Sequence, residues 1–173
     1  MQAMNSFDEP QANARGEQQQ YLTFRQGEET FALPILVTKE ILEFPALTSV
    51  PLMAPCVRGV LNLRGQVVPV VDLAARFGRP PAAVTRRTCV VIVEIGSEDT
   101  RLDIGVVVDS VSQVIDIPAD QIEPPPSFGT RLRLDFIKGM GKVDGQFVLV
   151  LDAEHVLSVE EIATLGAVSS EAA

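Results

Sequence analysis

The feature that most constrains the fold of this chain is a motif that occurs twice. Residues 58–73 read RGVLNLRGQVVPVVDL, and residues 138–153 read KGMGKVDGQFVLVLDA. The copies align without a gap, and the identical residues are Gly59, Gly65, Gln66, Val68, Val70 and Asp72, which recur as Gly139, Gly145, Gln146, Val148, Val150 and Asp152. Two apolar runs joined by a short break that contains glycine predict a β-hairpin. The chain is therefore predicted to have two similar halves, each built on one such hairpin.

Short strand-like runs separated by turn residues make up most of the remaining chain. Residues 88–95 are almost all β-branched, which predicts a strand buried on both faces. Residues 34–44 fit either one helical turn or a strand with a bulge. Each half has about five short strands with regular turn signals, and closing such a set into a barrel removes its exposed edges. We expect an all-β fold of two five-stranded β-barrels with short helices and a C-terminal helix, and a groove between the barrels.

Changes in composition suggest the domain boundaries. Residues 1–20 are polar and aperiodic, so we expect a disordered tail. The folded region is predicted to span 21–165, with a first subdomain at 21–82, a second at 87–157 and a C-terminal helix at 158–165. The stretch 79–87, rich in proline and arginine, would connect the halves, and 166–173 would be a frayed tail.

The net charge of −9 argues against binding to nucleic acid or anionic membrane through the overall field of the protein. The two cysteines, Cys56 and Cys89, form no C-x-x-C pattern, so neither a zinc site nor a disulfide framework is predicted. The sequence starts without an apolar secretory segment, and no apolar run reaches the roughly 18 residues of a membrane span. We expect a cytoplasmic protein without metal or cofactor.

Two carboxylates, Asp72 and Asp152, occupy equivalent positions in the two halves. Paired carboxylates from two β-rich lobes could form a hydrolase site of the aspartic-protease kind. The alternative is that each residue caps the short helix after its strand, and Gly78 would end the first of these helices. We favour capping, because the Asp-Thr-Gly turn of those enzymes is missing, and His155, the only histidine, offers little to a catalytic triad.

Arg64 lies at the tip of the first repeated hairpin, where the second half has Asp144. A residue at a hairpin tip is expected to be exposed, and its guanidinium group can bind a carboxylate in bidentate fashion. The alternative is an ordinary solvated arginine, and Glu40 has the same alternative as an exposed acid.

Five segments of the chain together resemble the CheW family, the coupling proteins of bacterial chemotaxis. They are the run from Gly59 to Asp72, the following Arg76-Phe77-Gly78, the segment 104–112, the proline loop 124–128 and the segment 139–144. The resemblance covers about residues 21–161. It implies a non-enzymatic adapter of two SH3-like barrels that binds the cytoplasmic tips of methyl-accepting chemoreceptors and a CheA-type histidine kinase. It also implies recruitment to membrane-associated receptor arrays, without membrane insertion, and ring assembly with similar barrels.

The resemblance also suggests which residues contact partners. The positions predicted for receptor coupling are Arg64, Glu40, Thr38 and Val37, and those predicted for contacts of the kinase or receptor with the groove are Gly59, Asn62, Val107 and Val111. The chain departs from the family pattern at Leu42-Glu43, where many relatives have Arg-Gly. It also departs at Pro34, a position at which relatives often have an acidic residue. A coupling protein of a non-flagellar chemosensory pathway is therefore an alternative. No receiver or kinase domain accompanies the barrels, which argues against CheV-like and CheA proteins.

Overall fold

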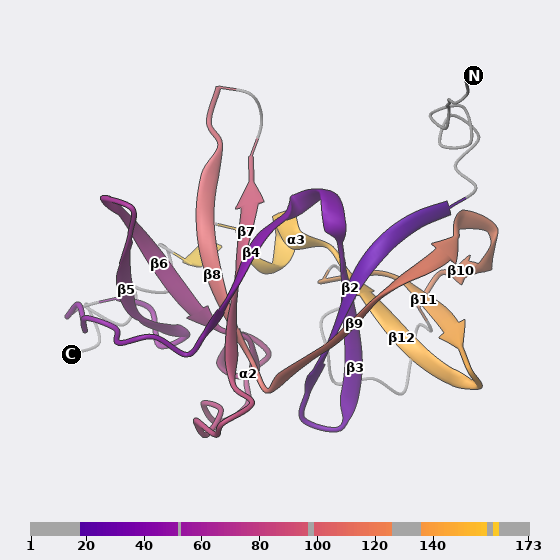
Figure 1. Ribbon diagram of the computed structural model, residues 1–173, viewed down its shortest axis with the longest axis horizontal. Helices are drawn as coiled ribbons and strands as arrows, with labels where there is room; N and C mark the ends of the chain where they lie inside the picture. The colour runs from indigo at the N-terminus through magenta and orange to yellow at the C-terminus, as the bar shows by residue number, and fades with distance from the viewer. Residues whose placement is uncertain (1–17, 52, 97–98, 126–135, 159–160, 163–173) are drawn as a thin grey trace, which may run out of the picture.

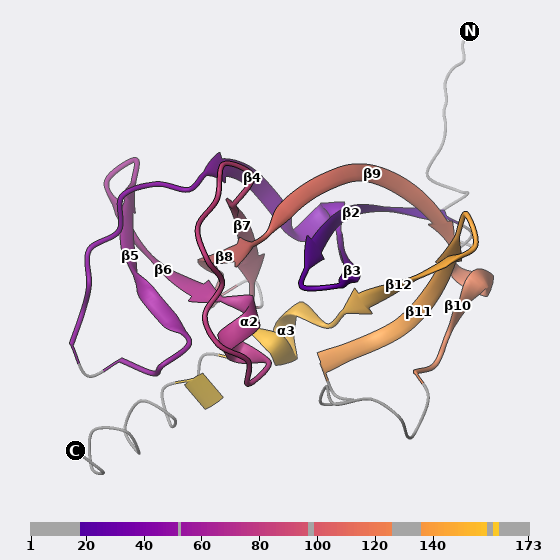
Figure 2. The same ribbon diagram turned by 90° about the horizontal axis from the view of Figure 1, so that it is seen from below.

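The computed structural model describes residues 18–51, 53–96, 99–125, 136–158 and 161–162. Its strands form two lobes that lie side by side (Figures 1 and 2). The six-stranded lobe has the order β10-β11-β12-β3-β2-β9, and its strands are β2 (Gln18–Gln26), β3 (Glu29–Pro34), β9 (Ser110–Pro118), β10 (Ile122–Glu123), β11 (Ile137–Val143) and β12 (Gln146–Leu151). The five-stranded lobe has the order β4-β7-β8-β6-β5, and its strands are β4 (Thr38–Glu43), β5 (Val57–Leu63), β6 (Gln66–Asp72), β7 (Cys89–Ile95) and β8 (Leu102–Val108).

The helices are short and connect the strands. In the part of the chain that the structure describes they include the 3₁₀ turns η1 (Ile35–Val37) and η2 (Ala119–Gln121) and the single α-helical turns α2 (Leu73–Arg76) and α3 (Ala153–Val156). Residues 34–44 contain both of the structures that their sequence suggests: the turn η1, and then β4, whose register shifts between Thr38 and Glu40. The all-β prediction is confirmed.

Each lobe takes strands from both halves of the chain. The hairpin β2–β3 joins the six-stranded lobe through a parallel pairing of β3 with β12, in which Ala32 lies opposite Val150. The hairpin β7–β8 joins the five-stranded lobe through a parallel pairing of β8 with β6, in which Gly105 lies opposite Val70. The predicted subdomains, 21–82 and 87–157, therefore do not correspond to the lobes, because the first hairpin of each half crosses to the other lobe.

The ends of the folded region also differ from the sequence-based boundaries. β2 begins at Gln18, inside the tail predicted at 1–20, because Gln18 and Gln19 pair with Pro118 and Ile117 of β9. Of the C-terminal helix predicted at 158–165, the described residues 161–162 are helical, and the backbone N–H of Ile162 donates to Ser158 O. Residues 1–17 and the predicted tail at 166–173 lie outside the described residues.

Both repeated hairpins have the same two-residue turn. Arg64 and Gly65 have φ angles of 52° and 86°, and Asp144 and Gly145 have φ angles of 53° and 81°. Positive φ at both central residues defines a type I′ turn, whose twist matches that of the flanking strands. The turn places Arg64 at the tip of the β5–β6 hairpin and confirms the predicted hairpins.

Gly59 closes the five-stranded lobe. The register of β5 against β6 shifts between Val57 and Gly59, and the next residue, Val60, exchanges two backbone hydrogen bonds of 2.9 Å with Thr48. A Cβ atom on Gly59 would lie 2.5 Å from Thr48 O, and its φ of 148° disfavours other residues. Glycine therefore allows the loop after β4 to approach β5. Gly139 occupies the equivalent bulge in β11, where a Cβ atom would collide with Ile122 of β10.

Three groups of buried side chains form the core. Each lobe has its own interior cluster, and a larger central cluster fills the junction of the lobes. The central cluster includes Phe24, Phe31 and Leu33 of the six-stranded lobe and Val71, Val91, Val93 and Val106 of the five-stranded lobe. Because the shared core is continuous, the interior of the junction is packed, and a binding surface between the lobes can only lie at its outer face.

Candidate protein-interaction site

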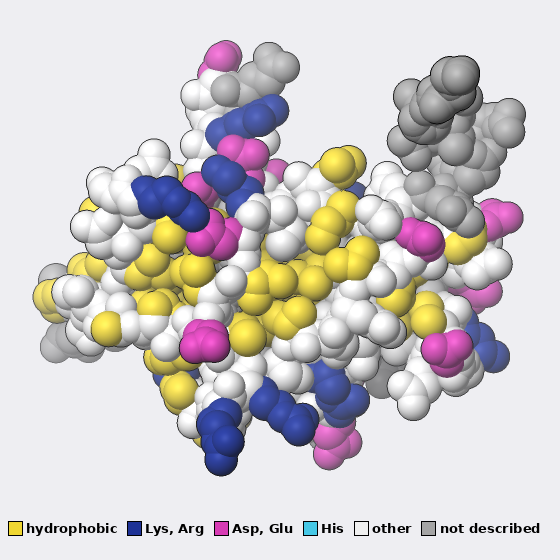
Figure 3. Space-filling model, viewed as in Figure 1, with side chains coloured by type: hydrophobic (Ala, Val, Ile, Leu, Met, Phe, Trp, Pro, Cys, Tyr) yellow, Lys and Arg dark blue, Asp and Glu magenta, His cyan; other side chains and the backbone are white. Residues whose placement is uncertain are grey.

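An exposed apolar surface lies where the lobes meet. Leu36 of η1 is 85% exposed, Ile41 of β4 is 44% exposed and Val114 of β9 is 47% exposed. β4 and β9 run along the same side of the molecule (Figure 2), and apolar side chains gather there at the centre of the face, over η1, β4 and part of β9 (Figure 3). We call Leu36, Ile41 and Val114 the apolar band. Large apolar side chains that remain in water mark a surface suited to bind another protein.

The two predicted coupling residues with charged side chains contact one another beside the apolar band. Arg64 Nη2 donates to Glu40 Oε1 at 2.7 Å, and the two side chains are 70% and 27% exposed. β4 and β5 are the two edges of the five-stranded sheet, so this ion pair joins the edges across the mouth of the lobe. An exposed ion pair of this kind contributes at most about 1 kcal/mol to the stability of the fold. A contribution to stability therefore does little to explain why the chain has both an arginine and a glutamate here.

The other predicted residues near the ion pair hold its framework in place. Asn62 Oδ1 accepts a hydrogen bond of 2.9 Å from Gly65 N, which fixes the turn that carries Arg64. Thr38 Oγ1 donates to Pro34 O at 3.1 Å and closes the η1 turn. Val37 is half-buried and packs against the central cluster. The contacts described for Asn62, Thr38 and Val37 are thus within the protein, where they support the backbone that carries the surface.

Not all predicted contact residues can reach a partner. Val107 is completely buried in the interior cluster of the five-stranded lobe, so the prediction that its side chain contacts a partner in the groove is wrong. The reason is that β8 lies between β6 and β7 and both of its faces are covered. Gly59 is also buried, and its contact is with Thr48. Val111 is half-buried in β9, against the central cluster.

Asp72 is a structural carboxylate. It is fully buried, and Oδ1 accepts from Ala75 N at 3.1 Å, so that it caps α2. Oδ2 accepts from Arg58 Nη1 at 2.5 Å and from Ala82 N at 3.0 Å. Because this carboxylate is fully buried and holds three donors of the protein itself, it is closed to a substrate, and the capping interpretation is confirmed for this residue.

Asp152 has the equivalent capping role in the other half. Its carboxylate accepts from His155 N at 3.2 Å and lies 3.0 Å from His155 Nδ1. The two aspartates thus each serve the helix that follows them. Among the described residues, no three potential metal ligands come together. None of the helices in the described part of the chain has the length and apolar character that a bilayer span needs.

Arg76 holds the two helical turns together and was not among the predicted site residues. It is buried, its Nε donates to Val156 O at 2.6 Å, and it forms an ion pair with Glu161. Its guanidinium group also lies 4.7 Å from the centroid of the Phe136 ring. Arg76 therefore fixes α2 of one half against α3 of the other, which keeps the lobes, and the surface between them, in one arrangement.

Known proteins with the same pattern identify the family. A family described as the CheW-like domain matches residues 20–161. This chain belongs to that family. Its relatives include Chemotaxis protein CheW of Klebsiella aerogenes, which is 32% identical over 145 residues that cover 84% of this chain and 85% of the relative. Protein FrzA of Myxococcus xanthus is 34% identical over 118 residues that cover 68% of this chain and 71% of the relative.

A solved structure agrees with the fold. The scaffolding protein TtCheW from Thermoanaerobacter tengcongensis superposes with a TM-score of 0.74 at 29% sequence identity, over 84% of this chain and 96% of that structure. The resemblance seen in the sequence motifs is therefore confirmed. Members of the CheW-like family are scaffolding adapters of chemotaxis and not enzymes, so this chain is not a hydrolase.

Proposed function

We propose that this chain is an adapter that couples the cytoplasmic tips of methyl-accepting chemoreceptors to a CheA-type histidine kinase in membrane-associated arrays. Family membership supports the adapter role, and the observation that carries the proposal is the Arg64–Glu40 pair beside the apolar band. An apolar surface supplies contact area to a helical receptor tip, and charged residues at its border fix the register of that helix.

Arg64 is the residue best suited to contact the receptor. Within the described residues its guanidinium group donates to Glu40 alone, so its other N–H groups can bind a carboxylate of a partner. Its backbone has a φ of 52°, a conformation that asparagine or glycine adopts more easily in this turn. An arginine at such a position is consistent with a function for the side chain outside the fold.

The test is reversal of the charge in Arg64→Glu. We expect a folded protein whose co-sedimentation with receptor-containing membranes and kinase falls about tenfold or more, because a lost charge-assisted contact is replaced by repulsion. The matched control is Asp144→Lys, which reverses a charge in the same type of turn in the other lobe and should leave assembly unchanged. Wild-type co-sedimentation of Arg64→Glu would refute the proposal.

A charge exchange separates the contact with the partner from the internal ion pair. The double variant Arg64→Glu/Glu40→Arg keeps an ion pair between β4 and the β5–β6 turn but moves the positive charge to the other strand. If Arg64 contacts the receptor, assembly remains weak in the double variant. Full recovery would show that the internal pair is all that matters and would contradict the proposed contact.

The similarity to Protein FrzA and the unusual Leu42-Glu43 favour a second candidate, a coupling protein of a non-flagellar chemosensory pathway. Leu42 packs against the interior cluster of the five-stranded lobe, whereas Glu43 is exposed and adds a negative charge to the strand that carries Glu40. Deletion of the gene decides between the pathways. Loss of the directed swimming response supports the flagellar pathway, and unchanged swimming with loss of another receptor-controlled response supports the second candidate.

A further inference from the structure

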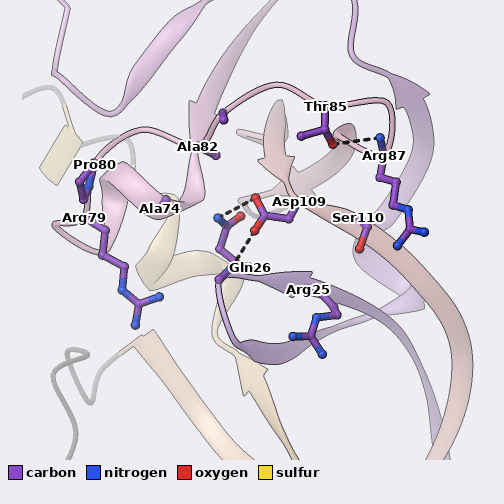
Figure 4. Close-up of a pocket in the computed structure, with 12 residues that line it drawn as sticks. Arg25, Gln26, Ala74, Arg79, Pro80, Ala82, Thr85, Arg87, Asp109 and Ser110 are labelled. Carbon is purple, nitrogen blue, oxygen red and sulfur yellow. Dashed lines mark hydrogen bonds between the residues drawn. The ribbon is translucent and has the colours of Figure 1, made fainter.

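A cleft of about 500 Å³ lies between the β2–β3 turn and the segment that connects β6 to β7. Figure 4 shows it, and its lining includes Arg25, Arg79 and Arg87 together with Asp109 and Ser110. Arg25 of β2 and two arginines of the β6–β7 connection thus meet in a protein whose net charge is −9. The cleft does not include the apolar band or the Arg64–Glu40 pair.

Two acidic groups at the cleft, Asp109 of its lining and the neighbouring Glu29, are already engaged. Asp109 accepts from Gly27 N at 2.8 Å and from Gln26 Nε2 at 3.2 Å, so its carboxylate is turned toward the β2–β3 turn (Figure 4). Glu29 binds Arg79 through both of its oxygens, at 3.0 and 3.3 Å. These bonds neutralise Arg79 and fix the turn next to Arg25.

Arg25 and Arg87 remain as uncompensated charges. Both are exposed, and within the described part of the chain neither side chain has an ion-pair or hydrogen-bond partner. In Figure 4 they lie toward one end of the cleft, with Ser110 between them, and Arg79 lies at the other end. Two free guanidinium groups on opposite walls provide paired N–H donors for carboxylate oxygens.

The wall that carries Arg87 is ordered before any ligand arrives. Thr88 Oγ1 accepts from Thr85 N at 2.8 Å, and Thr85 Oγ1 accepts from Arg87 N at 3.1 Å. Ala82 is bound at both of its backbone groups, to Asp72 and Arg58. A segment rich in proline and small residues is thus held by a dense set of hydrogen bonds, which lowers the entropic cost of binding a ligand there.

We propose that this cleft binds an acidic peptide segment of another protein, with its carboxylates on Arg25 and Arg87. The cleft is larger than a single anion requires, and its lining includes apolar atoms of Ala74, Pro80, Ala82 and Ala83, which suit the methylene groups of a peptide. The two arginines make a local basic site in an acidic protein, and charge complementarity favours an acidic segment of a partner protein.

The test uses the full chain and a short fluorescein-labelled peptide in which glutamate alternates with alanine. Fluorescence anisotropy should show binding at low ionic strength that weakens as salt is added. The variant Arg25→Gln/Arg87→Gln should bind about tenfold more weakly or worse, because each arginine supplies a charge-assisted contact. The matched control, Arg101→Gln/Lys142→Gln, removes the same charge from exposed positions outside the cleft and should bind as the wild type does.

Four results would overturn the proposal: no binding of the peptide by the wild type, equal weakening in both double variants, equal binding of a peptide with glutamine in place of glutamate, or binding of phosphatidylserine vesicles instead of the peptide through the same arginines. Thermal unfolding should be unchanged in both double variants, since all four side chains are exposed. The assay contains neither receptor nor kinase, so its outcome is independent of the coupling function proposed above.

Discussion

Replacing Asp72 with alanine should destabilise the protein far more than the same change at Asp152, although the two residues are equivalent in the repeat. Asp72 is fully buried, and removing it leaves the guanidinium group of Arg58 without its partner. Breaking a buried pair costs about 3–5 kcal/mol, and the lower value applies because the Arg58 side chain is 23% exposed. Loss of the α2 cap adds about 1 kcal/mol.

The free energy of unfolding should therefore fall by about 4 kcal/mol in Asp72→Ala, which for a domain of this size lowers Tm by about 8–16 °C. Asp152→Ala loses a cap and a contact with the mainly exposed His155, so we expect about 1 kcal/mol and about 2–4 °C. Calorimetry and urea titration measure both changes. Equal losses at the two positions would refute the argument that burial and the Arg58 contact set the difference.

Two further predictions concern the close contacts and the thiols. Gly59→Ala should lower the free energy of unfolding by more than Gly65→Ala in urea titration, because a Cβ atom at Gly59 meets Thr48 O at 2.5 Å whereas Gly65 opens to empty space; equal losses would contradict the closure role of the bulge. Burial raises the pKa of the Cys56 thiol and, from a half-buried site, that of Cys89. Since the thiolate is the reactive form, iodoacetamide should label Cys89 slowly and faster as pH rises above about 8.5, and label Cys56 only after unfolding; mass spectrometry that finds Cys56 modified first would contradict this.

Local features were predictable because local physical chemistry produces them. The repeated hairpins follow from alternating apolar residues around a two-residue turn with glycine, and the exposed position of Arg64 follows from its place at that turn. The aspartate caps follow from the short polar side chain before a helical run. The run of apolar residues from Ile104 to Val108 also predicts a strand covered on both faces, so the burial of Val107 could have been foreseen.

Pairings between distant segments could not be predicted in the same way. The exchange of hairpins depends on which edges of the sheets meet, and the sequence of β3 or β8 does not reveal its parallel partner. The Arg64–Glu40 contact joins residues 24 positions apart, across the mouth of a closed lobe. The hydrogen bond from Arg76 of α2 to Val156 of α3 depends on how the two helical turns lie relative to one another, and this arrangement exists only in the assembled core.

The exchange of hairpins between the lobes has a consequence for how such a protein could be divided or rebuilt. A break in the chain between β6 and β7 would not release two independent modules, because each fragment would contain a hairpin whose sheet is completed by the other fragment. The fragments should instead reassociate into one noncovalent particle when expressed together. Strand exchange and a shared core thus join the two lobes into one structural unit.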